Sequence, residues 1–477
     1  MRKLDRIRKG WVLARTVFAV LALVCALPEV GTAQPGGVDC PSSVACPDEG
    51  GGLPVVIGQE NLWFGDVRLG GVNYLIDGVP ILPFEPLLGL TASNNELAKA
   101  QEMQWFFRYT GQTSRNAIFS VEWFAPRDLI DRNLRRSFLP LLEQTEARWN
   151  IFYDPVLASV WRGLGPGPVD FSRPETRKMF QNDMVYLRKN YFEHPNYWRI
   201  NGKPVLHVWA ARELVRNADD LFAAARSGGI YICGDVFGQR GAEPPLDCRT
   251  GFTAATPEIV SRNRFQRVQQ VLPDFERYFQ SGDDKDLIPA FSFQYDDEVF
   301  RTRIGTGGTA IKILAEGRGD LRDWLELADR YSRPIDGSRY IWVGTLNGWA
   351  EATTIYPTEK GRREFWIRGE PRRVEPYHFA KLEVIQRALY PDHRYKGPRI
   401  ERSEDGAIVF RNADVLAGVR IKVVSDGVTA NLDYLELDGI TVLPNLDREW
   451  RPDFDFTKIT IRVKNLDGRR TKKVIRP

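Results

Sequence analysis

Carboxylates and large aromatic side chains recur in short clusters directly after apolar runs. These clusters are Glu122-Trp123, Tyr153-Asp154, His207-Val-Trp209, Gly234-Asp235, Tyr295-Asp296 and Asn347-Gly-Trp349-Ala-Glu351. Aromatic rings stack against the C–H faces of sugars, and carboxyl groups bind sugar hydroxyls or move protons to a glycosidic oxygen. The combination predicts a carbohydrate site.

Each acid also fits a purely structural role. Glu122 and Asp154 could accept a backbone N–H where a loop begins, and Asp296 could neutralise the nearby Arg301. His207 lies within an apolar run, which favours a hydrogen-bonded residue inside the fold over a catalyst. The catalytic candidates among the strand-end acids therefore remain Glu122, Asp154, Asp296 and Glu351.

Strand-like and helix-like runs alternate from about residue 71 to 396, and they must bring these side chains together. The expected strands are 72–76, 117–123, 150–153, 204–209, 230–233, 251–254, 287–293 and 340–345. The expected helices include 94–109, 174–192, 211–226, 258–279, 320–331 and 376–389. The alternation predicts an α/β fold, a (β/α)8 TIM-type barrel whose strands end at one mouth. A doubly wound open sheet is the alternative, but the chain lacks a Gly-x-Gly-x-x-Gly turn after a strand.

The pattern changes after residue 396 to short alternating strands separated by Asp-Gly turns, such as Asp405-Gly406 and Asp426-Gly427. Residues 397–477 are therefore expected to form a small β-sandwich-like domain. Such a domain either packs on the barrel or binds a glycan or a partner.

Residues 1–33 have the pattern of a secretory signal peptide: a cationic start, an apolar run of 11 residues and a small-residue site before Gln34. The alternatives are an uncleaved anchor, for which the run is short of the ~20 residues needed, and lipidation at Cys25. Export predicts a periplasmic or secreted bacterial protein without a membrane span after cleavage. Residues 34–70 form a Gly/Pro-rich leader in which little chemistry is expected.

Four cysteines remain after cleavage, in two closely spaced pairs. We expect disulfides between Cys40 and Cys46 and between Cys233 and Cys248, because the compartment is oxidising. The four histidines show no paired ligand spacing, so we predict neither a metal nor another cofactor. The acids at 296–298 are the reservation, because they could hold calcium.

The overall composition indicates a folded chain that carries no net charge after residue 33. Hydrophobic residues make up 43% of the 477 residues, which excludes disorder. Residues 1–33 hold six basic and two acidic side chains, so the remainder carries 60 of each. The chain therefore lacks the overall basic field expected of a nucleic-acid-binding protein.

Two stretches resemble a known family. YFEHPNYWRINGKPVLHVW (191–209) and LNGWAEATTIYP (346–357) resemble the corresponding segments of glycoside hydrolase family 99 and family 99-like barrels, which include endo-α-mannosidases. The resemblance implies a (β/α)8 barrel. It also implies two glutamates three residues apart: the first removes the 2-hydroxyl proton so that the sugar forms an epoxide, and the second is the general acid/base.

Only the second of those glutamates is present. Glu351 matches the acid/base and Gly348 stands at the other position, while Asn347 and Trp349 match as substrate-binding residues. Tyr356 replaces the usual acid before Pro357 and is a further substrate-binding candidate. The remaining substrate-binding candidates are Trp123, Trp209, Asp235 and Tyr295.

Three functions follow from these observations. The first is an exported glycoside hydrolase that cleaves a polysaccharide or glycan, with Glu351 as proton donor and Asp154, Glu122 or Asp296 as its partner. The second is a non-catalytic glycan-binding or polysaccharide-assembly protein on the same barrel, which Gly348 favours. The third is a glycosyl-transferring enzyme that uses a lipid-linked or polymeric donor.

Overall fold

The structure is a computed structural model that describes most of the chain after residue 51. The described residues are 52–64, 75–76, 79–80, 86, 92–111, 114–165, 167–238, 242–251, 265–280, 285–296, 298, 312–315, 317–348, 353–358, 363–367, 370–374, 380–392, 399–402, 408–411, 416–425, 428–434, 447–450, 457–465 and 470–476. The expected signal peptide and the pair Cys40 and Cys46 lie outside them.

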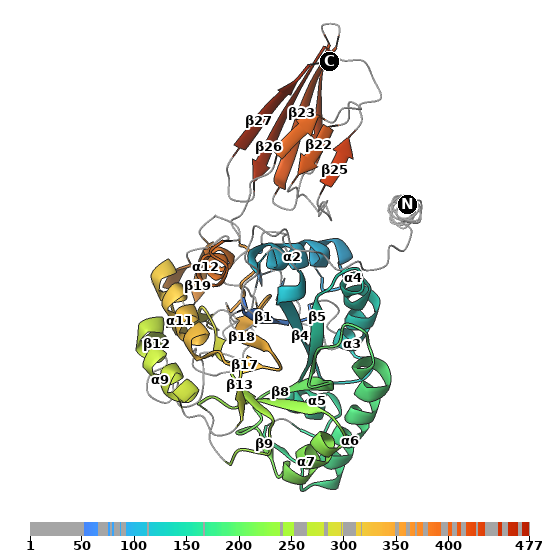
Figure 1. The fold of residues 1–477 in the computed structure, drawn as a ribbon, viewed down its shortest axis with the longest axis vertical. Coiled ribbons are helices and arrows are strands. Elements are labelled where there is room, and N and C mark those ends of the chain that lie inside the picture. The colour runs from blue at the N-terminus through green and yellow to red at the C-terminus, as the bar shows by residue number, and fades with distance from the viewer. Residues whose placement is uncertain are drawn as a thin grey trace, which may run out of the picture. The chain divides into compact units, whose positions relative to one another are not determined.

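Parallel strands form a nearly closed barrel, as the alternating pattern predicts (Figure 1). In chain order they are β1 (Val55–Glu60), β4 (Ala117–Trp123), β5 (Arg148–Tyr153), β8 (Lys203–Val208), β10 (Tyr231–Asp235), β11 (Cys248–Thr250), β13 (Asp286–Leu287) with β14 (Ala290–Phe291), and β18 (Ser338–Thr345). The seventh position is split, since β13 pairs with β11 and β14 pairs with β18. The last barrel strand, β18, pairs in parallel with the first, β1.

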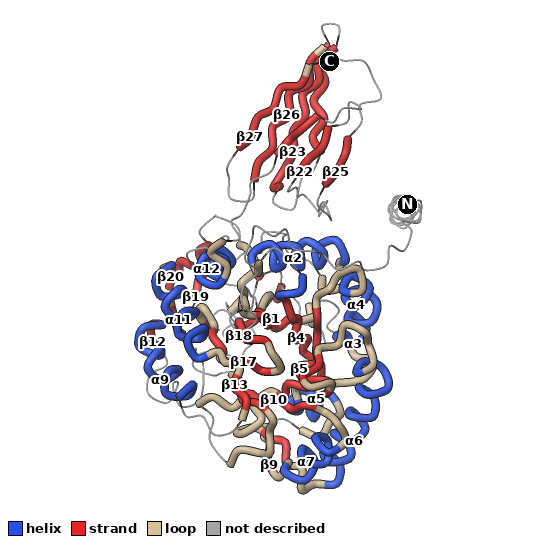
Figure 2. Tube along the Cα trace, in the orientation of Figure 1, coloured by secondary structure: helices blue, strands red, loops and turns tan. Residues whose placement is uncertain are grey.

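Helices surround the strands as an outer ring (Figure 2). They are α2 (Glu96–Tyr109), α3 (Leu129–Asn133), α4 (Leu139–Leu142), α5 (Pro155–Trp161), α6 (Pro174–Leu187), α7 (Asp219–Ser227), α9 (Val268–Gln280), α11 (Arg318–Tyr331) and α12 (Ala380–Leu389). Asn95 begins α2 by accepting the N–H of Ala98 through its side chain. Pro174 starts α6 in its first turn, where proline lacks only an N–H that no helical carbonyl would accept.

Strand alternation divides the side chains between the barrel interior and the helix layer. Phe119 of β4 contacts Phe106 of α2, with ring centroids 5.4 Å apart, so it faces the helices. His207 of β8 contacts Trp342 of β18, with centroids 4.5 Å apart, and these strands are not neighbours in the sheet. This contact crosses the barrel, and both rings therefore fill its interior.

The first barrel strand lies earlier than the sequence pattern predicted. It is β1 (Val55–Glu60), inside the segment expected to be a leader, and all six residues are buried. The strand expected at 72–76 is instead one side of a small hairpin, β2 (Leu75–Ile76) with β3 (Val79–Pro80). The sixth strand ends at Thr250, just before the expected 251–254. The sequence pattern did not indicate β1, because its apolar run, Val55–Ile57, is only three residues long and follows the glycines at 50–52.

Smaller sheets accompany the barrel. β12 (Phe265–Arg267), β16 (Lys312–Leu314) and β15 (Tyr295–Asp296) form a three-stranded sheet. The short hairpin strands β7 (Arg199–Ile200) and β17 (Pro334–Ile335) extend β8 and β18, while β6 (Val169–Asp170) pairs with β9 (Val215–Arg216) and β19 (Arg363–Ile367) with β20 (Glu370–Val374).

The C-terminal region is all-β, as expected. One antiparallel sheet contains β21 (Arg399–Arg402), β22 (Ile408–Arg411) and β25 (Asp447–Trp450). The other contains β24 (Val428–Tyr434), β23 (Leu416–Ser425), β26 (Lys458–Asn465) and β27 (Arg470–Ile475). Among the helices that the structure describes, none is both long and apolar enough to cross a bilayer.

Candidate active site

Polar side chains gather at the C-terminal ends of the barrel strands. Glu60 ends β1, Glu122 is the penultimate residue of β4, Asp154 follows β5, Asp235 ends β10 and Asn347 follows β18. All five residues are buried. Parallel strands of a barrel end on one face, so these residues share the face at which barrel enzymes carry their active sites.

Asp154 is a buried carboxyl fixed by backbone donors. Its Oδ1 accepts the N–H groups of Val156 and Leu157, each at 2.8 Å, and so caps α5. Burial raises the pKa of Asp154 to about 7, against the opposing effect of those two hydrogen bonds. The expected capping role is therefore present, and the same carboxyl has a pKa suited to proton exchange near neutral pH.

Glu122 faces the barrel interior beside Asp154. It pairs in register with Phe152 of β5 and shares a strand face with Ser120, whose Oγ lies 3.2 Å from the Nδ1 of His207. The N–H of Asp154 donates to the carbonyl oxygen of Trp123 at 3.1 Å, which joins the ends of β4 and β5. Glu122 and Asp154 are thus the two predicted acids that the structure brings to adjacent strand ends.

Trp123 does not line the mouth, contrary to the sequence-based expectation. Its indole is fully buried, stacks on Tyr186 at a centroid distance of 5.9 Å, and donates from Nε1 to Asp131 at 3.0 Å. The reason is strand alternation, because neighbours in a strand point to opposite faces and Glu122 takes the interior one. The side chain of Trp209 is half-buried. Its backbone N–H donates to the backbone carbonyl of Tyr153 at 2.9 Å, next to Asp154 in sequence.

His207 is a hydrogen-bonded interior residue, the role that its apolar run favours. Its Nδ1 lies 2.9 Å from the side-chain nitrogen of Asn150. Burial lowers the pKa of His207 to about 3, so the ring is neutral at physiological pH. At the next strand, Asp235 accepts the N–H of Ala210 at 3.2 Å through Oδ2.

Tyr295 and Asp296 are not at a barrel strand end. The seventh barrel strand ends at Phe291, and these two residues form β15 in the three-stranded sheet. Tyr295 is buried, and the Asp296 carboxylate accepts the N–H of Glu298 at 3.1 Å. Asp296 therefore makes a local turn contact, and its catalytic role stays a prediction.

Glu60 is a buried acid that the sequence analysis missed. Its Oε1 accepts from the Nζ of Lys99 at 2.6 Å and from the Nδ2 of Asn347 at 2.7 Å, and its Oε2 accepts from the hydroxyl of Tyr356 at 3.2 Å. Lys99 also donates to Glu102 at 2.8 Å. Burial raises the pKa of Glu60 to about 7, while Lys99 opposes and Glu102 reinforces the shift.

Asn347 and Tyr356 are fully buried and bind Glu60, which corrects their expected role in substrate binding. The side chain of Asn347 also accepts the N–H of Asn61 and donates to its carbonyl, both at 2.8 Å. Both donor hydrogens of its amide, and one lone pair of the amide oxygen, are therefore engaged by protein groups. Trp349 and Glu351 lie between these residues in sequence, outside the described residues.

Gly348 has no room for a side chain. A Cβ built there would lie 1.8 Å from the Oγ1 of Thr345 and 2.1 Å from the Oγ1 of Thr353. These two hydroxyls are hydrogen-bonded to each other. The position at which the family resemblance implies a glutamate is thus filled by a threonine pair.

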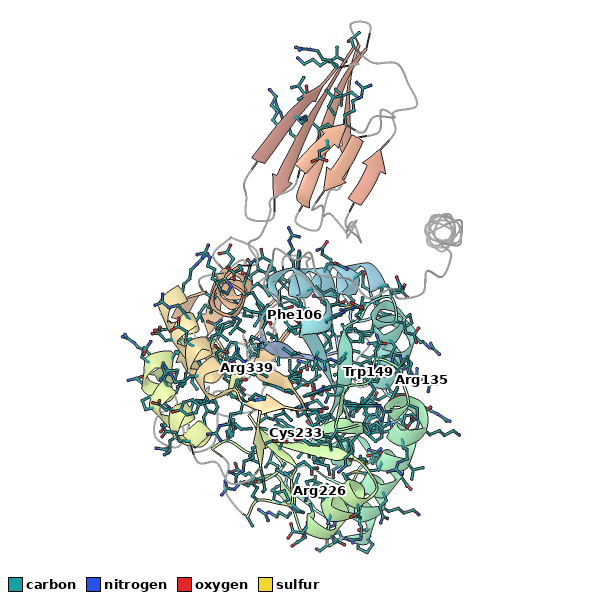
Figure 3. The ribbon with its side chains drawn as sticks, in the orientation of Figure 1. Phe106, Arg135, Trp149, Arg226, Cys233 and Arg339 are labelled. Atoms are coloured by element: carbon teal, nitrogen blue, oxygen red, sulfur yellow. A yellow bond between two sulfur atoms is a disulfide. The ribbon has the colours of Figure 1, made fainter. Side chains whose placement is uncertain are left out.

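A disulfide joins Cys233 and Cys248, as predicted from their spacing. The two cysteines are register partners on the adjacent strands β10 and β11, and Figure 3 marks Cys233 within the barrel. Within the described residues, no three His, Cys, Asp or Glu side chains are grouped so that they could hold a metal ion.

Solved structures similar to this one are glycoside hydrolases and a related protein. One is the GH99 endo-α-mannosidase from Bacteroides thetaiotaomicron in complex with bis-tris propane. It matches with a TM-score of 0.48 and 17% sequence identity, and the match covers 73% of this chain and 98% of that chain. Another structure of that enzyme gives a TM-score of 0.48 and 19% identity, covering 71% of this chain and 96% of that chain. A protein described as glycoside hydrolase-like gives a TM-score of 0.48 and 14% identity, covering 71% of this chain and 94% of that chain. No family model and no curated protein sequence matches the chain. The likeness concerns the fold, and the site's own residues must carry any statement about its chemistry.

Proposed function

We propose that the protein is an exported glycoside hydrolase that cleaves a polysaccharide or glycan, with Glu351 as its proton donor. The observation that carries this proposal is the buried attachment of Asn347 and Tyr356, on either side of Glu351 in sequence, to Glu60 at the C-terminal end of β1. A segment attached in this way at the catalytic face of a barrel suits a residue that must be held against a substrate.

A glycosidase also needs a second carboxyl group. Asp154 and Glu122 are the best candidates, because they lie at adjacent strand ends on the same face. The raised pKa of Asp154 allows it to accept or donate a proton near neutral pH. Half-buried Trp209, next to Asp154 along the barrel rim, offers a ring for sugar stacking.

Export is part of the same proposal. The first 33 residues have the pattern of a signal peptide, and the bond between Cys233 and Cys248 suits an oxidising compartment such as the periplasm. A free-thiol assay on protein taken from the periplasm or medium tests this point. Reduced Cys233 and Cys248 in that protein would contradict it.

A non-catalytic glycan-binding protein is the second candidate, and one observation favours it. Gly348 stands where the family resemblance implies a catalytic glutamate, and the space around its Cα is occupied by Thr345 and Thr353. A barrel that has lost one of two catalytic carboxyls can retain its affinity for sugar while losing turnover.

One experiment separates the two candidates. The mature chain from Gln34 is screened against bacterial and plant glycans for new reducing ends, alongside Glu351→Gln and the exposed control Glu175→Gln. We expect Glu351→Gln to lower turnover by at least ~10² with glycan binding retained, because the amide cannot donate the catalytic proton. Glycan binding without cleavage, with Glu351→Gln changing only affinity, would replace the hydrolase by the binding protein.

A further inference from the structure

Glu60 contacts both flanks of the segment that carries Glu351. Asn347 precedes this segment and Tyr356 follows it, and their side chains donate to different oxygens of the Glu60 carboxylate, at 2.7 and 3.2 Å. Glu60 itself belongs to β1, whose six residues pair with β4 and β18. One carboxylate on a central strand is therefore the common attachment point for both flanks.

Lys99 holds that carboxylate from the helix layer. Its ammonium lies 2.6 Å from Glu60 and 2.8 Å from Glu102, and the side chains of all three residues are at most 6% exposed. Charge-assisted hydrogen bonds in a dry environment are short and directional. With donors from α2, from Asn347 and from Tyr356, Glu60 has little freedom to move.

Backbone hydrogen bonds tie the two flanks to each other. The N–H of Leu346 donates to the carbonyl of Gln59 at 2.7 Å, and the N–H of Tyr356 donates to the carbonyl of Leu346 at 3.0 Å. The hydroxyl of Thr354 donates to the same carbonyl at 2.7 Å, and Lys381 of α12 donates to the Thr354 carbonyl at 2.6 Å. These bonds tie the two described flanks, residues 346–348 and 353–358, to each other and to β1.

We propose that Glu60 is a positioning residue: it fixes the two described flanks of the 346–358 loop, at Asn347 and Tyr356, and thereby holds Glu351 for proton transfer. Glu60 is fully buried, so it acts through Glu351 and not on the sugar. The catalytic part of this inference rests on the proposed hydrolase function. The structural part, that Glu60 fixes the loop, does not.

The matched variants are Glu60→Gln and Glu102→Gln. Both carboxylates accept from Lys99, but among the described contacts only Glu60 reaches Asn347 and Tyr356. Hydrogen–deuterium exchange is measured on the amides of Leu346, Ile355 and Tyr356. We expect exchange at least tenfold faster in Glu60→Gln and within about threefold of wild type in Glu102→Gln, because only the first variant weakens the attachment of both flanks.

Kinetics on a cleaved glycan then tests the catalytic part. We expect Glu60→Gln to lower kcat at least tenfold with KM within about threefold, because a small displacement of the acid harms the transition state more than the bound substrate. Tyr356→Phe removes only one hydroxyl that donates to Glu60. Tyr356→Phe should also lower kcat at a nearly constant KM, but by a smaller factor than Glu60→Gln. It replaces Glu60→Gln in the test if that variant fails to fold.

The outcomes are distinct. Equal exchange of the loop amides in wild type, Glu60→Gln and Tyr356→Phe would overturn the inference. So would faster exchange with an unchanged kcat, or a rise in KM alone. A wild type that cleaves no glycan would count against the proposed function only, because the exchange comparison needs no substrate.

Discussion

Replacing Gly348 by alanine tests whether the missing family glutamate could be restored. A methyl group at this position would lie 1.8 Å from one threonine hydroxyl and 2.1 Å from the other. Ordinary van der Waals separation would require a displacement of about 1.5 Å. Thr345 is buried at the end of β18. To make room, either this strand end or the chain around Gly348 must therefore move.

The expected loss of stability has two parts. Overpacking a filled site typically costs ~1–3 kcal/mol. Separating the buried hydroxyls of Thr345 and Thr353, which are hydrogen-bonded to each other, adds about 1 kcal/mol. Gly348→Ala should therefore lower the free energy of unfolding by about 2–4 kcal/mol, and Gly348→Glu by at least as much, without any gain in turnover.

Urea denaturation with matched variants measures this loss. Gly319→Ala is the control, because no atom lies within 4 Å of the position that its Cβ would take and alanine is favoured in the first turn of α11. The double change Gly348→Ala with Thr353→Ala removes one of the two closest atoms and should recover part of the loss. A Gly348→Ala protein within ~0.5 kcal/mol of wild type would refute the reasoning.

Three further predictions concern the barrel. Replacing Cys233 and Cys248 by alanine should cost about 3 kcal/mol, since the bond closes a loop with a separation of 15 residues; an unchanged urea midpoint would contradict this. His207 has a pKa lowered to about 3 by burial, so its contribution to stability is present above pH 6.5 and is lost as the pH falls toward 3. From pH 7 to pH 5, wild type should lose about 2 kcal/mol relative to His207→Gln, and a pH-independent difference would exclude this assignment. Trp209→Ala should weaken glycan binding about threefold to tenfold, whereas Trp123→Phe should lower stability by about 1 kcal/mol and leave calorimetric binding constants unchanged.

The barrel could be predicted because long helices and apolar strands alternate in the sequence. The direction in which individual side chains point could not be predicted in the same way. Glu122 and Trp123 both end β4, but a strand shows only one of two neighbours to the interior, and the choice depends on register with β5. Trp123 finds its partner in Asp131 on α3, which no local pattern indicates.

Glu60 was missed for a related reason. Its burial depends on Lys99 and on Asn347, which lie 39 and 287 residues away in sequence. A short apolar run after a Gly/Pro-rich stretch carries no sign of those partners. Buried charges become recognisable only when the groups that neutralise them are known.

The pairing of β1 with β18 makes the candidate site a late product of synthesis and folding. Val55 pairs with Tyr340, and Glu60 reaches Asn347 across 287 residues. Contacts between residues so far apart in sequence form slowly, because a long stretch of chain must be closed into a loop before they add stability. A chain that stops short of residue 347 can form most of the barrel strands but cannot attach Glu60 to Asn347. A chain that lacks β1 or β18 therefore loses the candidate site together with the pairing of these two strands.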